Sequence, residues 1–228
     1  MPTSIAILLP VLNRPHRVKA LLRSLRDADE EGITTNPVFV CSDGDTRQIA
    51  AVKAAGLEPL ILYSPGRGEY ARKTNLATQT IEDEWLFMGA DDLHFHPGWA
   101  PACLDEHERT GCLVIGTNDL GNSAVMAGRH STHSLVHRDY LAFGTIDEPG
   151  KLLCDRYDHN SVDVEFWETA KARGQAAFAA DAHVEHLHRL WGKASFDATY
   201  RKGTRNATAD KRLYLQRRRL WARQVAVK

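Results

Sequence analysis

Two adjacent carboxylates, Asp91 and Asp92, are the residues of this chain whose type and placement most directly suggest chemistry. They follow the apolar run 85–88 after only Gly89 and Ala90. Such a run, closed by turn residues, predicts a buried strand, and its end lies where open α/β sheets bind ligands. Two neighbouring carboxylates repel each other unless a cation or a proton holds them together. The pair therefore predicts a divalent metal site, with capping of the next turn as the alternative.

Histidines provide a second set of possible metal ligands. His186 and His188 face the same side of an extended strand, as do His94 and His96 just after the carboxylate pair. For His94 and His96, packing and the lining of an acceptor pocket are equally good interpretations. A zinc hydrolase built on His183, His186 and His188 is disfavoured, because the helical His-Glu-x-x-His pattern is absent.

The elements that must position these residues alternate between strand and helix patterns. Strands are predicted at 5–9, 38–41, 60–63, 85–88, 113–116 and 177–184, and helices at about 18–25, 49–55, 70–81, 101–109, 137–143 and 161–173. Residues 117–135 read as loop or irregular strand. This alternation predicts a mostly parallel, doubly wound α/β sheet.

Two groups of cations suit phosphate. Arg67, between two glycines, and Arg72-Lys73 place flexible backbone and positive charge before a helix. A solvated loop is the alternative. Trp191 lies in a later stretch that mixes aromatic residues with cations. That stretch suits a flexible lid over a diphosphate or a contact with an acceptor.

The composition excludes little. Lys and Arg together number 29, as do Asp and Glu, so net charge gives no argument for nucleic acid or membrane. The basic residues crowd the last thirty positions, where Arg217, Arg218 and Arg219 lie in a predicted amphipathic helix with Leu213, Leu220, Trp221 and Val225 on one side. This helix predicts either a solvated face or contact with DNA, a membrane surface or a second subunit.

The four cysteines lack metal spacing, which favours a reducing compartment. No run approaches the roughly 18 apolar residues of a membrane span. The apolar run before Pro10 predicts a first strand, not a signal peptide. A cytoplasmic location is expected.

Five landmarks occur in order between residues 4 and 174: IAILLPVLNRP, VFVCSDGD, GEYARKTNLA, WLFMGADD and DVEFWETAKARG. This ordered set resembles the glycosyltransferases of the GT-A fold, in particular the family 2 type. The resemblance implies a Rossmann-like sheet with a smaller C-terminal acceptor or lid region. Residues 1–118 would form the nucleotide-sugar-binding half, residues 119–205 the acceptor-binding and catalytic half, and residues 206–228 a basic amphipathic helix.

The resemblance also implies roles for single residues. Pro10 and Asn13 would border the nucleotide pocket, and Asp43 would accept a hydrogen bond from the base or ribose. The remaining nucleotide-binding candidates are Arg67, Arg72, Lys73, Asn75 and Ala90.

Asp91 matches the metal-binding Asp-x-Asp of the family, but Gly89 replaces its first carboxylate, and Asp92 would take over part of the work. A late histidine, His188 in preference to His186, would complete a Mn²⁺ or Mg²⁺ site. Asp163 matches the acidic pair that opens a later helix, and would be the general base if the enzyme inverts the anomeric configuration. Alternatively, Asp163 supports only the first helical turn.

The expected function is metal-dependent transfer of a sugar, of the hexosyltransferase type, from a UDP- or GDP-sugar to an acceptor hydroxyl. One alternative is a nucleotide-sugar-binding module with impaired catalysis, because of Gly89. Another is a sugar-nucleotide nucleotidyltransferase, which the absence of glycine between Pro10 and Pro15 disfavours. The acceptor, a glycan, a protein or a modified DNA base, stays open, as does the oligomeric state. His94, His96 and Trp191 are weak acceptor candidates, and the chain also resembles small bacteriophage transferases.

Overall fold

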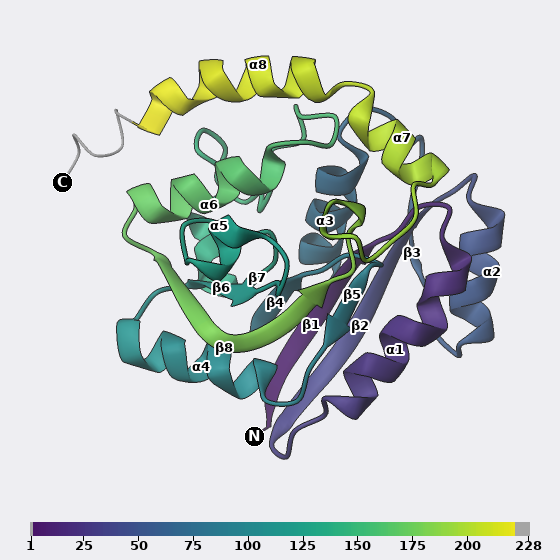
Figure 1. Ribbon diagram of the computed structural model, residues 1–228, viewed down its shortest axis with the longest axis horizontal. Helices are drawn as coiled ribbons and strands as arrows, with labels where there is room; N and C mark the ends of the chain where they lie inside the picture. Colours follow the sequence, from purple (N-terminus) through teal and green to yellow (C-terminus); the bar gives the residue numbers. More distant parts are fainter. Residues whose placement is uncertain (1, 222–228) are drawn as a thin grey trace.

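A computed structural model describes residues 2–221, and eight strands form one sheet within them. The strands are β1 (Thr3–Pro10), β2 (Ile33–Ser42), β3 (Leu60–Leu62), β4 (Trp85–Met88), β5 (Leu93–Phe95), β6 (Val114–Asn118), β7 (Ser134–His137) and β8 (Ala176–His186). Their order across the sheet is β3-β2-β1-β4-β7-β6-β8-β5 (Figure 1).

The sheet is mostly parallel, as predicted. β1 pairs in parallel with β2 and β4, β2 with β3, and β6 with β8. β7 is antiparallel to both of its neighbours, β4 and β6, and β5 is antiparallel to β8. The carboxyl ends of β1, β2 and β4 therefore meet at one edge. β5 and β7 are the strands that the sequence did not predict. They are as short as β3 and β4, but histidine and serine interrupt their apolar residues, so neither shows the continuous apolar run of a buried strand.

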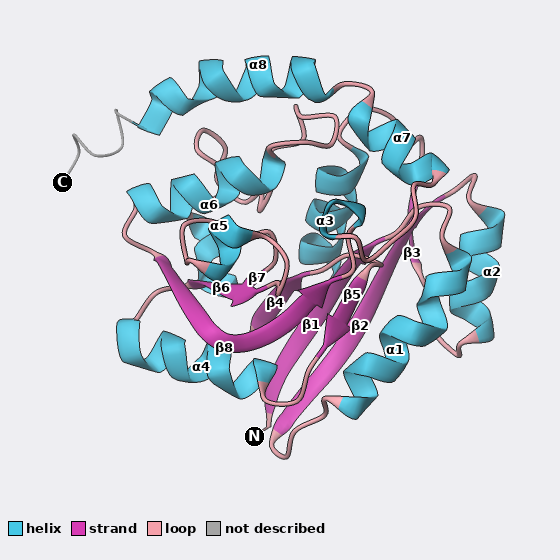
Figure 2. Ribbon diagram, in the orientation of Figure 1, coloured by secondary structure: helices cyan, strands magenta, loops and turns pink. Residues whose placement is uncertain are grey.

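Helices cover both faces of the sheet (Figure 2). The α-helices are α1 (Val18–Asp27), α2 (Thr46–Ala54), α3 (Glu69–Thr80), α4 (Trp99–Thr110), α5 (Ser123–Met126), α6 (Val162–Ala172), α7 (Ala198–Thr204) and α8 (Ala207–Arg217). Short 3-10 helices are η1 (Pro15–Arg17), η2 (Arg138–Ala142), η3 (Arg189–Trp191) and η4 (Arg218–Leu220). No helix within residues 2–221 is long and apolar enough to cross a membrane.

The continuous apolar run of β1 is buried on both faces, which explains why it does not alternate with polar residues. Ile5 and Ile7 belong to a core cluster with residues of α1, α2 and α4. Ala6 and Leu8 belong to a second cluster with residues of α3 and α6. The sheet thus separates two apolar cores. The polar residues that could form a site lie at the edge where the carboxyl ends of β1, β2 and β4 meet.

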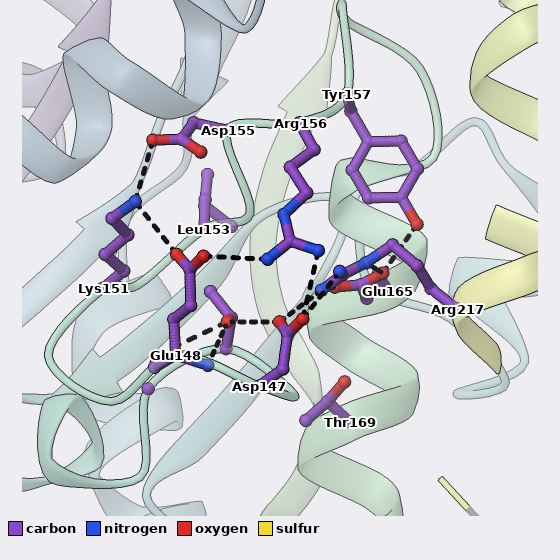
Figure 3. A network of polar contacts seen from close by, with 12 residues as sticks. Asp147, Glu148, Lys151, Leu153, Asp155, Arg156, Tyr157, Glu165, Thr169 and Arg217 are labelled. Atoms are coloured by element: carbon purple, nitrogen blue, oxygen red, sulfur yellow. Dashed lines mark hydrogen bonds and ion pairs between the residues drawn. The ribbon is translucent and has the colours of Figure 1, made fainter. Parts of the chain in front are cut away.

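The basic run near the C-terminus is partly structural. Arg217 is only 4% exposed, and its guanidinium binds Glu165 of α6 and Asp147 (Figure 3). These bonds fasten α8 to α6. Arg217 is therefore not available to an anionic partner, whereas Arg218 and Arg219 are exposed. Val225, assigned above to the apolar side of this helix, lies outside the described residues.

Candidate functional site

A cavity of about 430 Å³ lies at the carboxyl ends of β1 and β4. Its walls come from these strand ends, the start of α3, the loop before α6, the end of β8 and α7. Segments far apart in the chain thus meet in one hollow. The predicted site residues that line it are Pro10, Lys73, Ala90, Asp91, Asp92, Asp163, His186 and His188.

The carboxylate pair at the end of β4 is buried and forms ion pairs with the guanidinium of Arg14. Asp91 is 8% exposed and Asp92 4%. Arg14 Nη1 lies 2.9 Å from Asp91 Oδ1 and 3.2 Å from Asp92 Oδ2. Asp92 also has His186 Nε2 at 3.4 Å and accepts the hydroxyl hydrogen bond of Tyr200 at 3.0 Å. The predicted need for positive charge is therefore visible in the structure, and Arg14 was not foreseen.

Burial raises the pKa of Asp91, and the neighbouring Asp92 raises it further. Burial acts on Asp92 in the same sense, but the contacts from His186 and Arg14 outweigh it and lower the pKa of Asp92. Asp92 is thus the carboxylate whose charge is already balanced. Asp91 is the one that gains most from an additional cation.

The glycine at position 89 has a steric cause. A Cβ atom at this position would lie 2.8 Å from the carbonyl oxygen of Leu8 and 3.1 Å from a methyl carbon of Leu9. The Gly89 N–H donates to that same carbonyl at 2.9 Å. The close approach of β4 to β1 therefore leaves no room for a carboxylate at position 89.

The donor set suits a divalent cation only in part. Within residues 2–221, no group of three or more His, Cys, Asp and Glu side chains is arranged to hold a metal. Mg²⁺ is often held by one or two carboxylates, with phosphates and water completing its shell. Asp91 and Asp92 fit that pattern. His186 contacts Asp92, whereas His188, the preferred candidate from sequence, uses Nδ1 to accept the Leu190 N–H.

Asp163, the candidate base, lines the cavity at the start of α6. Its Oδ2 lies 3.3 Å from His130 Nε2. Burial favours the neutral acid, but the hydrogen bond from His130 outweighs it, so the pKa of Asp163 lies below its usual value. Asp163 is therefore ionised near neutral pH. His130 escaped sequence analysis because it lies in an irregular stretch.

Two predicted phosphate ligands have other partners. Lys73 Nζ lies 2.6 Å from the Val11 carbonyl oxygen and 2.8 Å from Glu69 Oε1. The side-chain amide of Asn75 donates to the Leu153 carbonyl at 2.8 Å and accepts the Leu153 N–H at 2.9 Å. Lys73 thus pairs with a buried carboxylate and Asn75 binds the backbone of a loop in this structure, and their roles as phosphate ligands stay predictions.

The other nucleotide candidates do not line the cavity. The Asn13 N–H donates to Asp45 at 2.6 Å, which joins the turn after β1 to the start of α2. Arg67 is exposed and lies 3.6 Å from a buried carboxylate, Asp210. Asn13, Asp43, Arg67 and Arg72 are not among the lining residues.

The weak acceptor candidates are also outside the lining. The rings of His94 and His96 contact each other, and His96 Nε2 lies 3.5 Å from Glu185. Trp191 packs so closely on Gly121 that a Cβ there would lie 2.7 Å from the indole. The three residues thus contact other residues in this structure, and their roles as acceptor contacts stay predictions.

His133 is a lining residue that sequence analysis missed. Its Nδ1 lies 2.8 Å from the Met88 carbonyl oxygen, which only accepts, so Nδ1 carries the proton. Burial lowers the pKa of His133 to about 4. The ring is therefore a neutral part of the cavity wall, fixed by the Met88 carbonyl and in contact with the ring of His186.

Asp210 of α8 holds the loop that forms one wall of the cavity. Its carboxylate is fully buried and accepts the N–H groups of Asp158, His159 and Asn160 at 2.8, 3.0 and 2.9 Å. Burial alone favours the acid, but these N–H groups stabilise the anion and lower the pKa of Asp210.

Asp210→Asn is expected to lower the free energy of unfolding at pH 7 by about 1.5–3 kcal/mol, the range for hydrogen bonds to charged groups. A depressed pKa stabilises the fold above the ordinary Asp value near 4 and loses that effect as pH falls through the folded value. The variant and the wild type should therefore converge in acid. Urea unfolding at pH 7 and pH 3 measures this, and Asp27→Asn, an exposed site, is the control. Equal losses for the two variants would contradict the role of Asp210.

The fold is similar to that of several solved structures. No family model matches the chain, and no curated protein matches it. A mannosyltransferase from Pyrobaculum calidifontis, in complex with GDP-Man and Mn²⁺, superposes with a TM-score of 0.62 at 14% identity, over 81% of this chain and 56% of that one. This chain thus spans little more than half of that enzyme.

Two further structures are similar. Glucosyl-3-phosphoglycerate synthase from Mycobacterium tuberculosis, in complex with UDP, gives a TM-score of 0.58 at 13% identity, over 91% of this chain and 78% of that one. S. aureus TarS, residues 1–349, gives 0.56 at 12% identity, over 80% and 59%. At such identities these likenesses show a shared fold.

Proposed function

We propose that this chain, which has the GT-A fold, is a metal-dependent glycosyltransferase that moves a sugar from a UDP- or GDP-sugar to an acceptor hydroxyl. One observation carries the proposal. Asp91 and Asp92 are buried at the end of β4, line the cavity and are arranged around a positive charge. Similar structures hold GDP-Man with Mn²⁺, or UDP.

Asp91 and Asp92 would hold Mn²⁺ or Mg²⁺, and the cation would neutralise the diphosphate leaving group. His186 and the Tyr200 hydroxyl fix the orientation of Asp92. Asp91 has Arg14 as its hydrogen-bond donor. A divalent cation at this pair would stabilise the protein, because burial raises the free energy of two adjacent negative charges.

Asp163 would accept the proton of the acceptor hydroxyl while the hydroxyl oxygen attacks the anomeric carbon. The bond between that carbon and the diphosphate breaks in the same step, so the configuration inverts. His130 holds Asp163 ionised, and His133 provides a neutral wall beside it. The contact between His130 and Asp163 supports this assignment.

Asp163→Asn is expected to lower kcat by about 10²–10⁴-fold, the usual contribution of a general base. The pKa of Asp163 lies below its usual value, so this base stays deprotonated down to a pH of about 4. Its protonation should therefore cause no fall in the wild-type rate above that pH. Steady-state release of nucleoside diphosphate checks the rate, and NMR of the product checks the anomer. Glu168→Gln, on the same helix, is the control and should keep full activity. Retention of configuration, or an unimpaired Asp163→Asn, would remove the base role.

A thermal-shift screen of UDP- and GDP-sugars with and without Mn²⁺, followed by mass spectrometry of the sugar-bearing product, tests the function. Stabilisation by one donor and a product heavier by one hexose would support glycosyl transfer. Donor binding without any turnover would instead indicate a binding module. Formation of a nucleotide sugar from a nucleoside triphosphate and a sugar phosphate would indicate a nucleotidyltransferase.

A further inference from the structure

Arg14 presents two edges to two different groups of carboxylates. Its Nη1 contacts Asp91 and Asp92 at 2.9 and 3.2 Å. Its other edge, Nε and Nη2, donates to both carboxylate oxygens of Asp197 at 2.8 and 3.2 Å. The ring of Tyr200 lies 4.3 Å from the guanidinium carbon. The inner edge therefore belongs to the site, and a residue 183 positions away occupies the outer edge.

Asp197 differs from the other two carboxylates. Its side chain is 32% exposed, against 9% for Asp91 and 6% for Asp92. Its other acceptor role is to cap α7, where it accepts the Tyr200 N–H at 2.9 Å. A planar guanidinium edge binds a carboxylate and a phosphate with the same two-bond geometry. Asp197 thus occupies a place that suits a phosphate group.

The helix that Asp197 caps, α7, has no buried residue to anchor it. It is seven residues long. Besides Asp197, its contacts with the site are a few polar bonds and two ring contacts. Thr199 donates to the Leu12 carbonyl, Tyr200 to Asp92 and Lys202 to Glu69, and the Gly203 carbonyl accepts from Asn160. The Tyr200 ring also lies against Arg14 and His188. Such a segment opens at low free energy, because it leaves no apolar core behind. In Figure 1, α7 lies at the end of the sheet opposite the N-terminus.

We propose that the outer edge of Arg14 is a binding fork for the diphosphate of the donor, and that Asp197 fills this fork when no donor is bound. This inference rests on the proposed function for the identity of the donor. When the diphosphate replaces the Asp197 carboxylate, the outer edge of Arg14 keeps an oxyanion as its partner. Because Asp197 begins α7, the exchange releases the helix that covers the cavity and admits the nucleotide sugar.

The fork would also add to the positive charge at the site. A metal held by Asp91 and Asp92 would contact the diphosphate, and the fork adds a second cationic contact to the same group. Asp197 lowers the apparent affinity for that diphosphate, since only the fraction of molecules with an open fork can bind.

Inorganic pyrophosphate in the presence of EDTA is the probe, with binding measured by titration calorimetry. Asp197→Asn keeps the cap, because asparagine caps helices as well as aspartate does, but loses the competing charge. It should bind pyrophosphate about 5–10-fold more tightly than the wild type, once the closed fraction is removed. Asp181→Asn, at an exposed position of β8, controls for the general effect of removing one negative charge.

Arg14→Lys keeps the charge but cannot form the two-bond fork. It should weaken pyrophosphate binding at least about tenfold and should cancel the gain from Asp197→Asn in the double variant, which is the coupling of a direct contact. An Asp197→Asn affinity equal to that of the wild type or of Asp181→Asn would overturn the proposal, as would the same gain in the Arg14→Lys background.

Pyrophosphate carries no sugar, so this outcome is separate from the test of transfer. A chain that binds pyrophosphate as described but turns over no nucleotide sugar would contradict the proposed function and leave the fork established.

Discussion

Asp91→Ala is expected to lower kcat/KM for the donor at least about a thousandfold, or about 4 kcal/mol of transition-state stabilisation. The loss should be this large because Asp92 cannot replace Asp91. Asp92 already accepts contacts from His186 and Tyr200, and Gly89 has no room for a third carboxylate. Release of nucleoside diphosphate with saturating Mn²⁺ is the measurement.

The control for Asp91→Ala is Asp181→Ala, which removes an exposed carboxylate outside the cavity and should stay within about twofold of the wild type, as surface substitutions usually do. Circular dichroism of both variants checks that they fold. Full turnover of the nucleotide sugar by Asp91→Ala would contradict the metal role.

Arg217→Ala is expected to lower the free energy of unfolding by about 3–5 kcal/mol, the usual result of removing one partner of a buried ion pair. Arg217 donates to both oxygens of Glu165 at 2.7 and 2.8 Å and to both oxygens of Asp147 at 2.9 and 2.6 Å. Without it, Glu165 keeps the Tyr157 hydroxyl at 2.6 Å as its remaining side-chain contact (Figure 3). Urea unfolding measures the loss.

Arg212→Ala is the matched control, since it removes an exposed arginine from the same helix and should change the free energy of unfolding by less than about 0.5 kcal/mol. If both variants unfold at the same urea concentration, Arg217 does not fasten α8 to α6. The basic run would then regain its alternative interpretation as a surface for an anionic partner.

The sheet and its ligand-binding edge could be predicted from sequence because they depend on local patterns. The apolar run of β4 ends at Gly89, and the carboxylates follow immediately. A strand buried on both faces shows as a continuous apolar run, and its end fixes which residues reach the edge. This local pattern predicts the position of Asp91 and Asp92, whereas Asp163 and the late histidines were expected only from the family resemblance, with His188 preferred over His186. All five residues line the same cavity.

The partners of those residues could not be predicted, because they depend on distant contacts. Arg14 meets Asp197 across 183 positions, and a single arginine in a turn carries no periodic signal. The charge of Lys73 suggested phosphate, whereas its burial against Glu69 gives it a structural partner. Arg217 looked like one of three equivalent basic residues, and only the packing of α8 on α6 distinguishes it.

Titration calorimetry of UDP and GDP with and without Mn²⁺ tests most directly whether the carboxylate pair holds a metal together with a diphosphate. We expect one of the two nucleotides to bind at least about tenfold more tightly with Mn²⁺, a gain of about 1.4 kcal/mol, and we expect Asp91→Ala to remove that gain. Equal affinity with and without Mn²⁺ for both nucleotides, or a gain that survives in Asp91→Ala, would contradict the account.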